Sequence, residues 1–217
     1  MMRFPARGLL LLLAGSVLPP AGAQPADSLK YVELVAPQAT IASDRIVVTE
    51  FFSYQCPHCF SFDPVLEHWV SELPDDVLFE RVAISIGYRQ WVPIARAFHT
   101  LQAMGEFDDL HHAVFRAIHV DGERFYDKES IVQWLQDQGV DAGEFSAAYD
   151  SFSVDVAAGR AERRSTAHRV DSVPALAIDG KYRVAIGDNG TVEYFERQLA
   201  GVSELIDKIR AARRDSR

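Results

Sequence analysis

The only two cysteines of this chain, Cys56 and Cys59, follow directly after a segment that is typical of a buried strand. That segment, residues 45–52, is β-branched and aromatic without polar alternation, as expected of a central strand covered on both faces. Pro57 suits the first turn of a helix, and apolar residues at helical spacing continue beyond it. We therefore expect the cysteine pair at a strand-to-helix junction.

The order of the predicted elements indicates an α/β fold. A strand at residues 77–84 follows the first helix, which argues for a parallel pair of strands. From about residue 90 to residue 169 the apolar spacing is helical and is punctuated by glycines, so we expect an all-helical insertion. The sheet resumes at residues 175–178, and Asp179-Gly180 predicts a hairpin to a further strand. A closing amphipathic helix is expected after it.

The first residues indicate export. Two arginines precede an apolar run over residues 9–18, and Ala21-Gly22-Ala23 forms a small-x-small cleavage pattern. The run has about half of the roughly 20 residues that cross a bilayer, so residues 1–23 are predicted to be a cleaved signal peptide and not an anchor. Residues 24–43 would then form an N-terminal arm that can add an edge strand to the sheet.

Composition excludes two classes of protein. Cleavage would remove Arg3 and Arg7 and change the formal net charge from −9 to −11, which disfavours nucleic-acid binding. An exported chain of this length with two cysteines is not a disulfide-dense scaffold, because a core of this size needs no covalent staples. A bond between Cys56 and Cys59 is therefore not expected to serve stability.

The chemistry expected at the junction is that of a stabilised thiolate. Cys56 would lie beside the unpaired N–H groups of the first helical turn, and the helix macrodipole contributes up to ~2 kcal/mol, or roughly one pKa unit. Larger shifts need hydrogen bonds and a nearby cation, and His58 is the only side chain within the motif that supplies positive charge near neutral pH. A stabilised thiolate makes the disulfide form a strong oxidant. Pro57 and His58 are thus predicted to set the redox poise.

Two other interpretations of the cysteine pair compete with a redox-active disulfide. A structural zinc site usually needs four ligands, and the sequence has no second Cys-x-x-Cys and no spaced histidine pair. An inert disulfide closing so short a loop would stabilise little. The other histidines are expected to be surface or packed residues: His68, His99, His111, His112, His119 and His168. Arg160, Arg163 and Arg164, with Glu162 among them, are expected on a solvated helix face.

The sequence contains, in order, a strand, Cys-Pro-His-Cys, a helix, a strand, a helical insertion and Val173-Pro174 before a hairpin. This order resembles the DsbA family of periplasmic thiol:disulfide oxidoreductases. The resemblance implies a thioredoxin fold with an inserted all-helical domain. Residues 24–88 and 170–217 would form the thioredoxin-like domain, and residues 89–169 the insertion. It further implies a monomeric enzyme without cofactor or metal that oxidises reduced, unfolded secreted proteins and is reoxidised by a membrane partner of the DsbB type.

The resemblance also assigns roles to individual residues. Cys56 would be the exposed cysteine that meets the substrate, and Cys59 the buried partner that resolves the mixed disulfide. Pro174 resembles the family's cis-proline, which lies against the cysteine pair, and Val173 would offer its backbone to a substrate strand. The family most often has Gly-Val-Pro where this chain has Ser172-Val173-Pro174, a departure that affects the expected loop shape and not the mechanism.

Glu50 stands inside the apolar strand, where an unpaired carboxylate is costly to bury. One interpretation is a strand-end salt bridge. The other follows the resemblance and places Glu50 under the cysteine pair, where it moves protons for Cys59. Family members usually carry a lysine on the neighbouring strand, whereas this chain offers Arg81, whose charge cannot be titrated away. Whether Arg81 pairs with Glu50 stays open at this point.

Two rival functions remain. A disulfide isomerase or reductase could use the same fold, but known periplasmic isomerases have a dimerisation domain before the redox domain, and only about 20 residues precede the first core strand of the mature chain. The second rival is a periplasmic module in which the dithiol captures copper or zinc.

Overall fold

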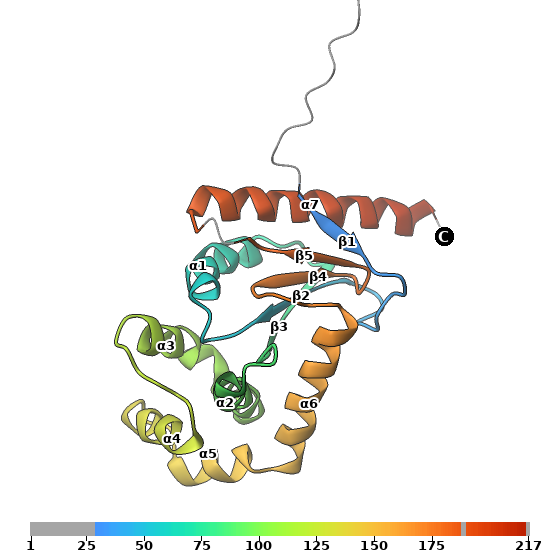
Figure 1. The fold of residues 1–217 in the computed structure, drawn as a ribbon. Coiled ribbons are helices and arrows are strands. Elements are labelled where there is room, and N and C mark those ends of the chain that lie inside the picture. Colours follow the sequence, from blue (N-terminus) through green and yellow to red (C-terminus); the bar gives the residue numbers. More distant parts are fainter. Residues whose placement is uncertain (1–28, 188–189, 216–217) are drawn as a thin grey trace, which may run out of the picture.

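The computed structural model describes residues 29–187 and 190–215, and the predicted signal peptide lies outside them. Within the described residues, one sheet has the strand order β1-β5-β4-β2-β3 (Figure 1). β2 and β3 are parallel, as predicted, and the other neighbouring strands are antiparallel. The strands are β1 (Tyr31–Glu33), β2 (Ile46–Phe52), β3 (Val77–Ala83), β4 (Ala175–Ile178) and β5 (Tyr182–Ala185).

The helices follow the predicted order. One helix connects β2 to β3, a run of helices separates β3 from β4, and a long helix follows the β4–β5 hairpin. The arm after the predicted signal peptide does add an edge strand, β1, which pairs with β5. The helical elements are α1 (Pro57–Ser71), the 3-10 turn η1 (Arg89–Trp91), α2 (Val92–Met104), α3 (Phe107–His119), α4 (Lys128–Asp137), α5 (Ala142–Tyr149), α6 (Phe152–Ala167) and α7 (Val192–Asp215).

Two hydrophobic cores cover the two faces of the sheet. On one face, α1 and α7 pack together through aromatic contacts such as Phe62 with Phe195, whose ring centroids are 5.2 Å apart. On the other face, α2 and α3 pack on the ends of β2 and β3 through residues that include Phe98 and Phe115. Figure 1 shows α7 on one side of the sheet and α2 to α6 on the other. This arrangement is a thioredoxin fold with a helical insertion.

Strand β2 is the centre of both cores. All 7 of its residues are buried, as expected of a strand covered on both faces. Ile46 and Val48 contribute to the core under α1 and α7. Because side chains alternate along a strand, Glu50 is the next residue on that same face. The alternation of β2 therefore directs a carboxyl group toward α1, the helix that carries the cysteines.

The β4–β5 hairpin has the turn that its sequence predicts. Asp179 and Gly180 have φ angles of 54° and 62°, the left-handed conformation that an Asp-Gly hairpin turn requires. A Cβ atom at Gly180 would lie 2.1 Å from the carbonyl oxygen of Gln38, so the arm packs where only glycine leaves room.

One surface prediction was wrong. Arg164 of α6 does not face solvent: its Nη1 donates to Glu80 Oε2 at 3.1 Å, and its Nη2 to Thr49 Oγ1 at 3.4 Å. Glu162 accepts a hydrogen bond from the backbone N–H of Ser85 at 2.7 Å. The reason is that α6 returns along the edge of the sheet at β3, a proximity that helical periodicity does not reveal.

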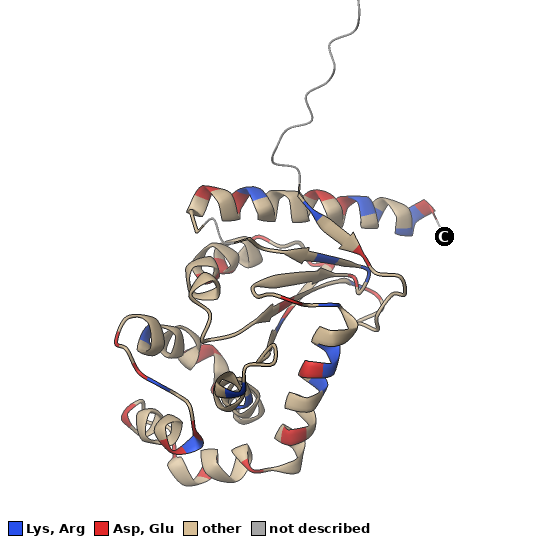
Figure 2. Ribbon diagram, in the orientation of Figure 1, with Lys and Arg blue, Asp and Glu red and all other residues tan. Residues whose placement is uncertain are grey.

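Charged residues of both signs are interspersed along α7, and no single-sign stripe runs along this helix (Figure 2). Among residues 29–187 and 190–215, no helix combines the length and the apolar character that crossing a membrane requires.

Candidate redox site

The cysteine pair begins helix α1, as the sequence predicts. Cys56 is the N-cap residue with an extended backbone, φ −89° and ψ 116°, and Pro57 occupies the start of the helix. Proline is tolerated there because the N–H that it lacks would have no partner within the helix. Both cysteines are free thiols in this structure. The junction therefore places the Cys56 sulfur at the N-terminal end of α1.

The expected exposure of Cys56 is wrong. Cys56 is only 5% exposed and Cys59 is fully buried, at 0%. The loop before β4 covers Cys56, whose Sγ donates a hydrogen bond to the carbonyl oxygen of Val173 at 3.4 Å. Cys56 is still the more accessible of the two sulfurs.

The covering loop has the backbone geometry that the resemblance implies. The peptide bond between Val173 and Pro174 is cis. Ser172, which stands where the family most often has glycine, is compatible with this geometry. The hydrogen bond from Cys56 Sγ places Val173 against this cysteine, although the two residues are 117 positions apart in sequence.

The two thiols ionise very differently. The pKa of Cys56 falls from an ordinary value of 9.0 to about 6, and the largest cause is the hydrogen bond from the Cys59 side chain. Burial opposes this effect, and the backbone N–H groups of Cys59 and His58 add to it. The charge of the exposed His58 makes the smallest of these contributions, so the predicted role of that charge is minor here.

Cys59 has the opposite behaviour. Burial raises the pKa of the Cys59 thiol well above its usual range, and the hydrogen bond to Cys56 raises it further. Cys59 therefore keeps its proton and donates it toward the Cys56 sulfur. The pair divides into one sulfur that ionises near neutral pH and one that does not.

Glu50 pairs with Arg81, which settles the question that the sequence left open. The two residues face each other in the β2–β3 register, and Arg81 Nε donates to Glu50 Oε2 at 3.1 Å. Burial nevertheless raises the pKa of Glu50 to about 8, with Arg81 opposing and the carboxylates of Asp63 and Glu67 adding to the rise. Glu50 is 2% exposed and holds a proton at neutral pH.

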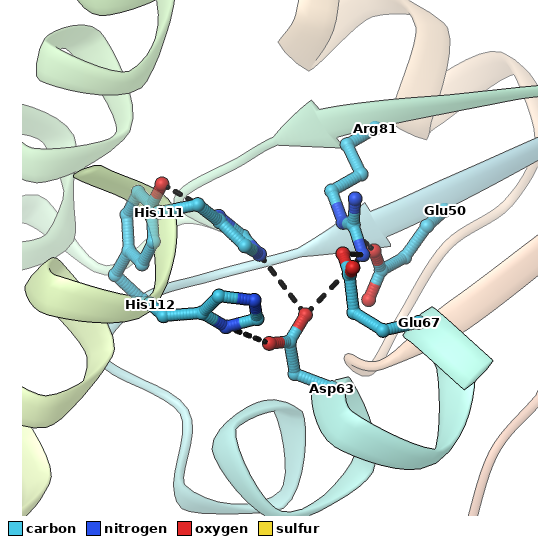
Figure 3. Close-up of polar contacts among 7 residues, drawn as sticks. Glu50, Asp63, Glu67, Arg81, His111 and His112 are labelled. Atoms are coloured by element: carbon cyan, nitrogen blue, oxygen red, sulfur yellow. Dashed lines mark hydrogen bonds and ion pairs between the residues drawn. The ribbon is translucent and has the colours of Figure 1, made fainter. Parts of the chain in front are cut away.

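Arg81 also binds two carboxylates of α1, which were not among the site residues predicted from the sequence. Arg81 Nη2 lies 3.3 Å from Asp63 Oδ1 and 2.5 Å from Glu67 Oε1 (Figure 3). A sequence signal for them did exist: Cys59, Asp63 and Glu67 are spaced four apart, which places them on one face of a helix. That face looks toward Glu50.

Two histidines of α3 complete the cluster. Asp63 lies between them, with Oδ1 at 2.9 Å from His111 Nε2 and Oδ2 at 3.0 Å from His112 Nδ1 (Figure 3). His111 Nδ1 is in turn 2.9 Å from the hydroxyl of Tyr54. From the sequence, His111 and His112 were expected to be surface or packed residues without a site role. No local pattern could have done so, because 48 residues separate Asp63 from His111.

Part of this cluster has the geometry of a metal site. One potential ligand atom each from Asp63, Glu67 and His111 lies within 4.8 Å of the others. Arg81, however, already donates hydrogen bonds to both carboxylates. The guanidinium therefore supplies the positive charge that a metal ion would otherwise bring to Asp63 and Glu67.

Comparison with known proteins points in the same direction as the geometry. A family model described as DSBA-like thioredoxin domain matches residues 89–200, a region that does not include the cysteine pair. The thiol:disulfide interchange protein DsbA of Pseudomonas syringae pv. tomato is 37% identical over 191 residues, covering 88% of this chain and 87% of that protein. The protein of the same name from Pseudomonas aeruginosa is 37% identical and covers 84% of this chain and 85% of its own length.

Solved structures of DsbA proteins also match this chain. The crystal structure of Pseudomonas aeruginosa DsbA matches with a TM-score of 0.79 at 35% identity, covering 86% of this chain and 95% of that chain. The structure of an oxidoreductase DsbA from Xylella fastidiosa matches with a TM-score of 0.75 at 28% identity, over 83% of this chain and 95% of that one.

Proposed function

Because the chain belongs to the DsbA family, we propose that it is a periplasmic protein-disulfide oxidoreductase that introduces disulfide bonds into folding secreted proteins through Cys56 and Cys59. The observation that carries the proposal is the division between the two thiols: the pKa of Cys56 is about 6, whereas burial holds the pKa of Cys59 well above its usual range. A sulfur that is stable as a thiolate is a good leaving group, so the disulfide form is a strong oxidant.

The proposed reaction is two successive thiol–disulfide exchanges. A substrate thiolate attacks Cys56 of the Cys56–Cys59 disulfide, the bond between the two cysteines breaks, and Cys59 leaves as a thiolate that takes up a proton. A second substrate thiolate then attacks the substrate sulfur of the mixed disulfide and releases Cys56 as a thiolate. Two electrons pass from the substrate to the enzyme, and no cofactor is needed because they move from sulfur to sulfur.

Glu50 is the proposed proton donor to Cys59. Its carboxyl group is protonated at neutral pH, and the charge of Glu50 is one of the influences that raise the pKa of Cys59, which supports this role. Glu50→Gln should slow peptide oxidation roughly 10-fold or more at pH 7. The deficit should shrink above pH 8, where the wild-type carboxyl group has itself lost the proton. Stopped-flow rates against pH measure this, and equal rates across the range would exclude the role.

The backbone of Val173, next to the Cys56 sulfur, would bind an extended segment of the substrate. A membrane protein of the DsbB type would reoxidise the dithiol. Residues 24–88 and 170–217 would act as the redox domain and residues 89–169 as its insertion. The enzyme would work as a monomer, which sedimentation velocity can check.

Trapping of intermediates tests the function directly. Cys59→Ala should leave Cys56 in mixed disulfides with many secreted proteins: the Cys56 thiolate attacks a substrate disulfide, one substrate sulfur leaves as a thiolate, and Cys59 is missing to displace the bound substrate. Cys56→Ala is the matched control and should trap none. Non-reducing electrophoresis followed by mass spectrometry identifies the partners. A single trapped partner would indicate a dedicated oxidase, and the absence of any adduct in Cys59→Ala would defeat the proposal.

A further inference from the structure

In the cluster beneath the cysteines, three carboxyl groups compete for one permanent cation. Arg81, on β3, carries one charge and contacts three carboxyl groups: Glu50 on β2 through Nε, and Asp63 and Glu67 on α1 through Nη2. Its side chain is 10% exposed, and those of Glu50 and Asp63 are 2% and 4% exposed. Solvent therefore screens little of the competition between Glu50 and Asp63 for this one cation.

Asp63 enters this competition with support from the helical insertion. His111 and His112 hold its two carboxylate oxygens from α3, at 2.9 Å and 3.0 Å. His111 is itself oriented by Tyr54, whose hydroxyl is 2.9 Å from the other ring nitrogen. The His111 side chain is 3% exposed, so this contact is internal to the protein. These bonds favour the ionised form of Asp63.

We propose that α3 acts on the redox site through this cluster: His111 and His112 hold Asp63 as an anion that competes with Glu50 for Arg81, so that Glu50 keeps the proton it gives to Cys59. His111, His112 and Asp63 are positioning residues in this scheme, since none of them touches the reacting sulfurs. The inference rests on the proposed role of Glu50, but its test does not use catalysis.

The coupling runs through charge and not through a chain of proton transfers. The guanidinium of Arg81 stays protonated at any pH that the protein experiences, so it cannot pass a proton from Glu50 to Asp63. The guanidinium can instead attract several carboxylates at once, so its attraction for each one depends on the others. The groups that act on Glu50 are Arg81 from β3, Asp63, Glu67 and Cys59 from α1, and Tyr54 from the loop after β2. Each negative neighbour of Arg81 weakens its hold on the Glu50 anion.

The Glu50 titration provides the test. In reduced protein labelled with ¹³C at the glutamate carboxyl carbons, the Glu50 resonance is assigned by its loss in Glu50→Gln. The wild-type midpoint should lie near pH 8. Asp63→Asn removes the competing charge and should lower that midpoint by about one pH unit. Asp109→Asn, which removes an exposed carboxylate in the first turn of α3, is the matched control and should leave it unchanged.

Variants of His111 separate electrostatic coupling from loosened packing. His111→Phe removes a donor that holds Asp63 as an anion, so the competition for Arg81 weakens and the Glu50 midpoint should fall by about 0.5 pH unit. Loosened packing would hydrate Glu50 and also lower the midpoint, but it would do so whether or not Asp63 is present. His111→Gln keeps an amide donor and should restore the wild-type value. In the Asp63→Asn background, His111→Phe should cause no further change, because the group through which it acts is absent.

Two outcomes overturn the inference: a Glu50 midpoint in Asp63→Asn that equals the wild-type value, or a downward shift in His111→Phe that is equally large in the Asp63→Asn background. If Asp63→Asn does not fold, Glu67→Gln replaces it. That change removes the other partner of Arg81 Nη2, a side chain that is 41% exposed, and should lower the midpoint by a smaller amount. Failure of the Cys59→Ala trapping experiment would instead reject the proposed function and leave the Glu50 titration interpretable.

Discussion

At the scale of single residues, the Cys56 thiolate is held mainly by its own helix turn. The Cys59 thiol donates to it, the N–H groups of Cys59 and His58 follow, and the charge of His58 contributes least. His58 is exposed, so solvent weakens its field at the sulfur. The first turn of α1 therefore sets most of the acidity of Cys56, and the residue types between the cysteines adjust it.

A neutral residue at position 58 tests this order of contributions. In His58→Ser, the pKa of Cys56 should rise from about 6 by less than one unit, which corresponds to a change in reduction potential of less than about 30 mV. The variant should be slightly less oxidising. Thiolate absorbance against pH gives the first value, and equilibrium with glutathione gives the second. A rise of the pKa to that of a free thiol would show that the imidazolium, and not the backbone, holds the anion.

At the scale of elements, α1 and α6 connect the redox site to the rest of the fold. α1 presents Cys59, Asp63 and Glu67 on the face that meets β2, and its N-terminal turn contacts α3 where Phe60 stacks on His119 with ring centroids 4.9 Å apart. α6 is tied to the sheet through Arg164, which bonds Glu80 on β3 and Thr49 on β2. The last helix of the insertion is thereby anchored beside the strand that carries Glu50.

Loss of the ion pair between Arg164 and Glu80 should lower the free energy of unfolding without changing the pKa values of the two thiols. Arg164→Leu leaves the partly buried Glu80, whose side chain is 16% exposed, without its cation, and should lower the free energy of unfolding by about 2 kcal/mol. Arg163→Leu, at an exposed neighbouring position of α6, should change it by less than about 0.5 kcal/mol. Urea unfolding monitored by tryptophan fluorescence measures both. Equal effects of the two variants would contradict a specific role for Arg164.

At the scale of the whole molecule, the thiolate links redox state to stability. The pKa of Cys56 in the folded, reduced protein is about 6, below its ordinary value of 9.0. This stabilisation is complete above the unfolded pKa and is lost as pH falls through about 6. At pH 8 it amounts to on the order of 3 kcal/mol, because two pH units separate 8 from the Cys56 pKa. A disulfide closing so short a loop contributes about 2 kcal/mol in the opposite sense.

The reduced protein should therefore be the more stable form at pH 8, and its advantage should vanish or reverse at pH 5. Urea midpoints of the oxidised and reduced forms at the two pH values provide the measurement. Cys56→Ser removes the titrating thiol, so its stability should lack the pH dependence that the reduced wild type shows between pH 6 and 9. An oxidised form that is more stable at pH 8 would contradict the proposal that this protein is a strong oxidant.

Some of the molecule follows from local sequence alone. The apolar run over residues 45–52 has no regular polar face, which is typical of a central strand, and Pro57 after Cys56 suits the first turn of a helix, where its missing N–H has no partner to lose. The Asp179-Gly180 turn and the helical character of the insertion follow in the same way, since turn conformation and apolar spacing are properties of neighbouring residues. The resemblance then pointed to Glu50 and to the cis peptide bond at Pro174.

Tertiary structure alone decided the rest. Three contacts join segments that are distant in the chain. Val173 covers Cys56, and Arg81 binds Glu50, Asp63 and Glu67. Two histidines of α3 bind Asp63. Patterns along a sequence report which face of an element is apolar, but not which partner that face meets. Residues 56–59 therefore identify the cysteine pair from the sequence alone. The charged residues that influence the proton of Glu50 could be identified only from the packing of the strands and helices.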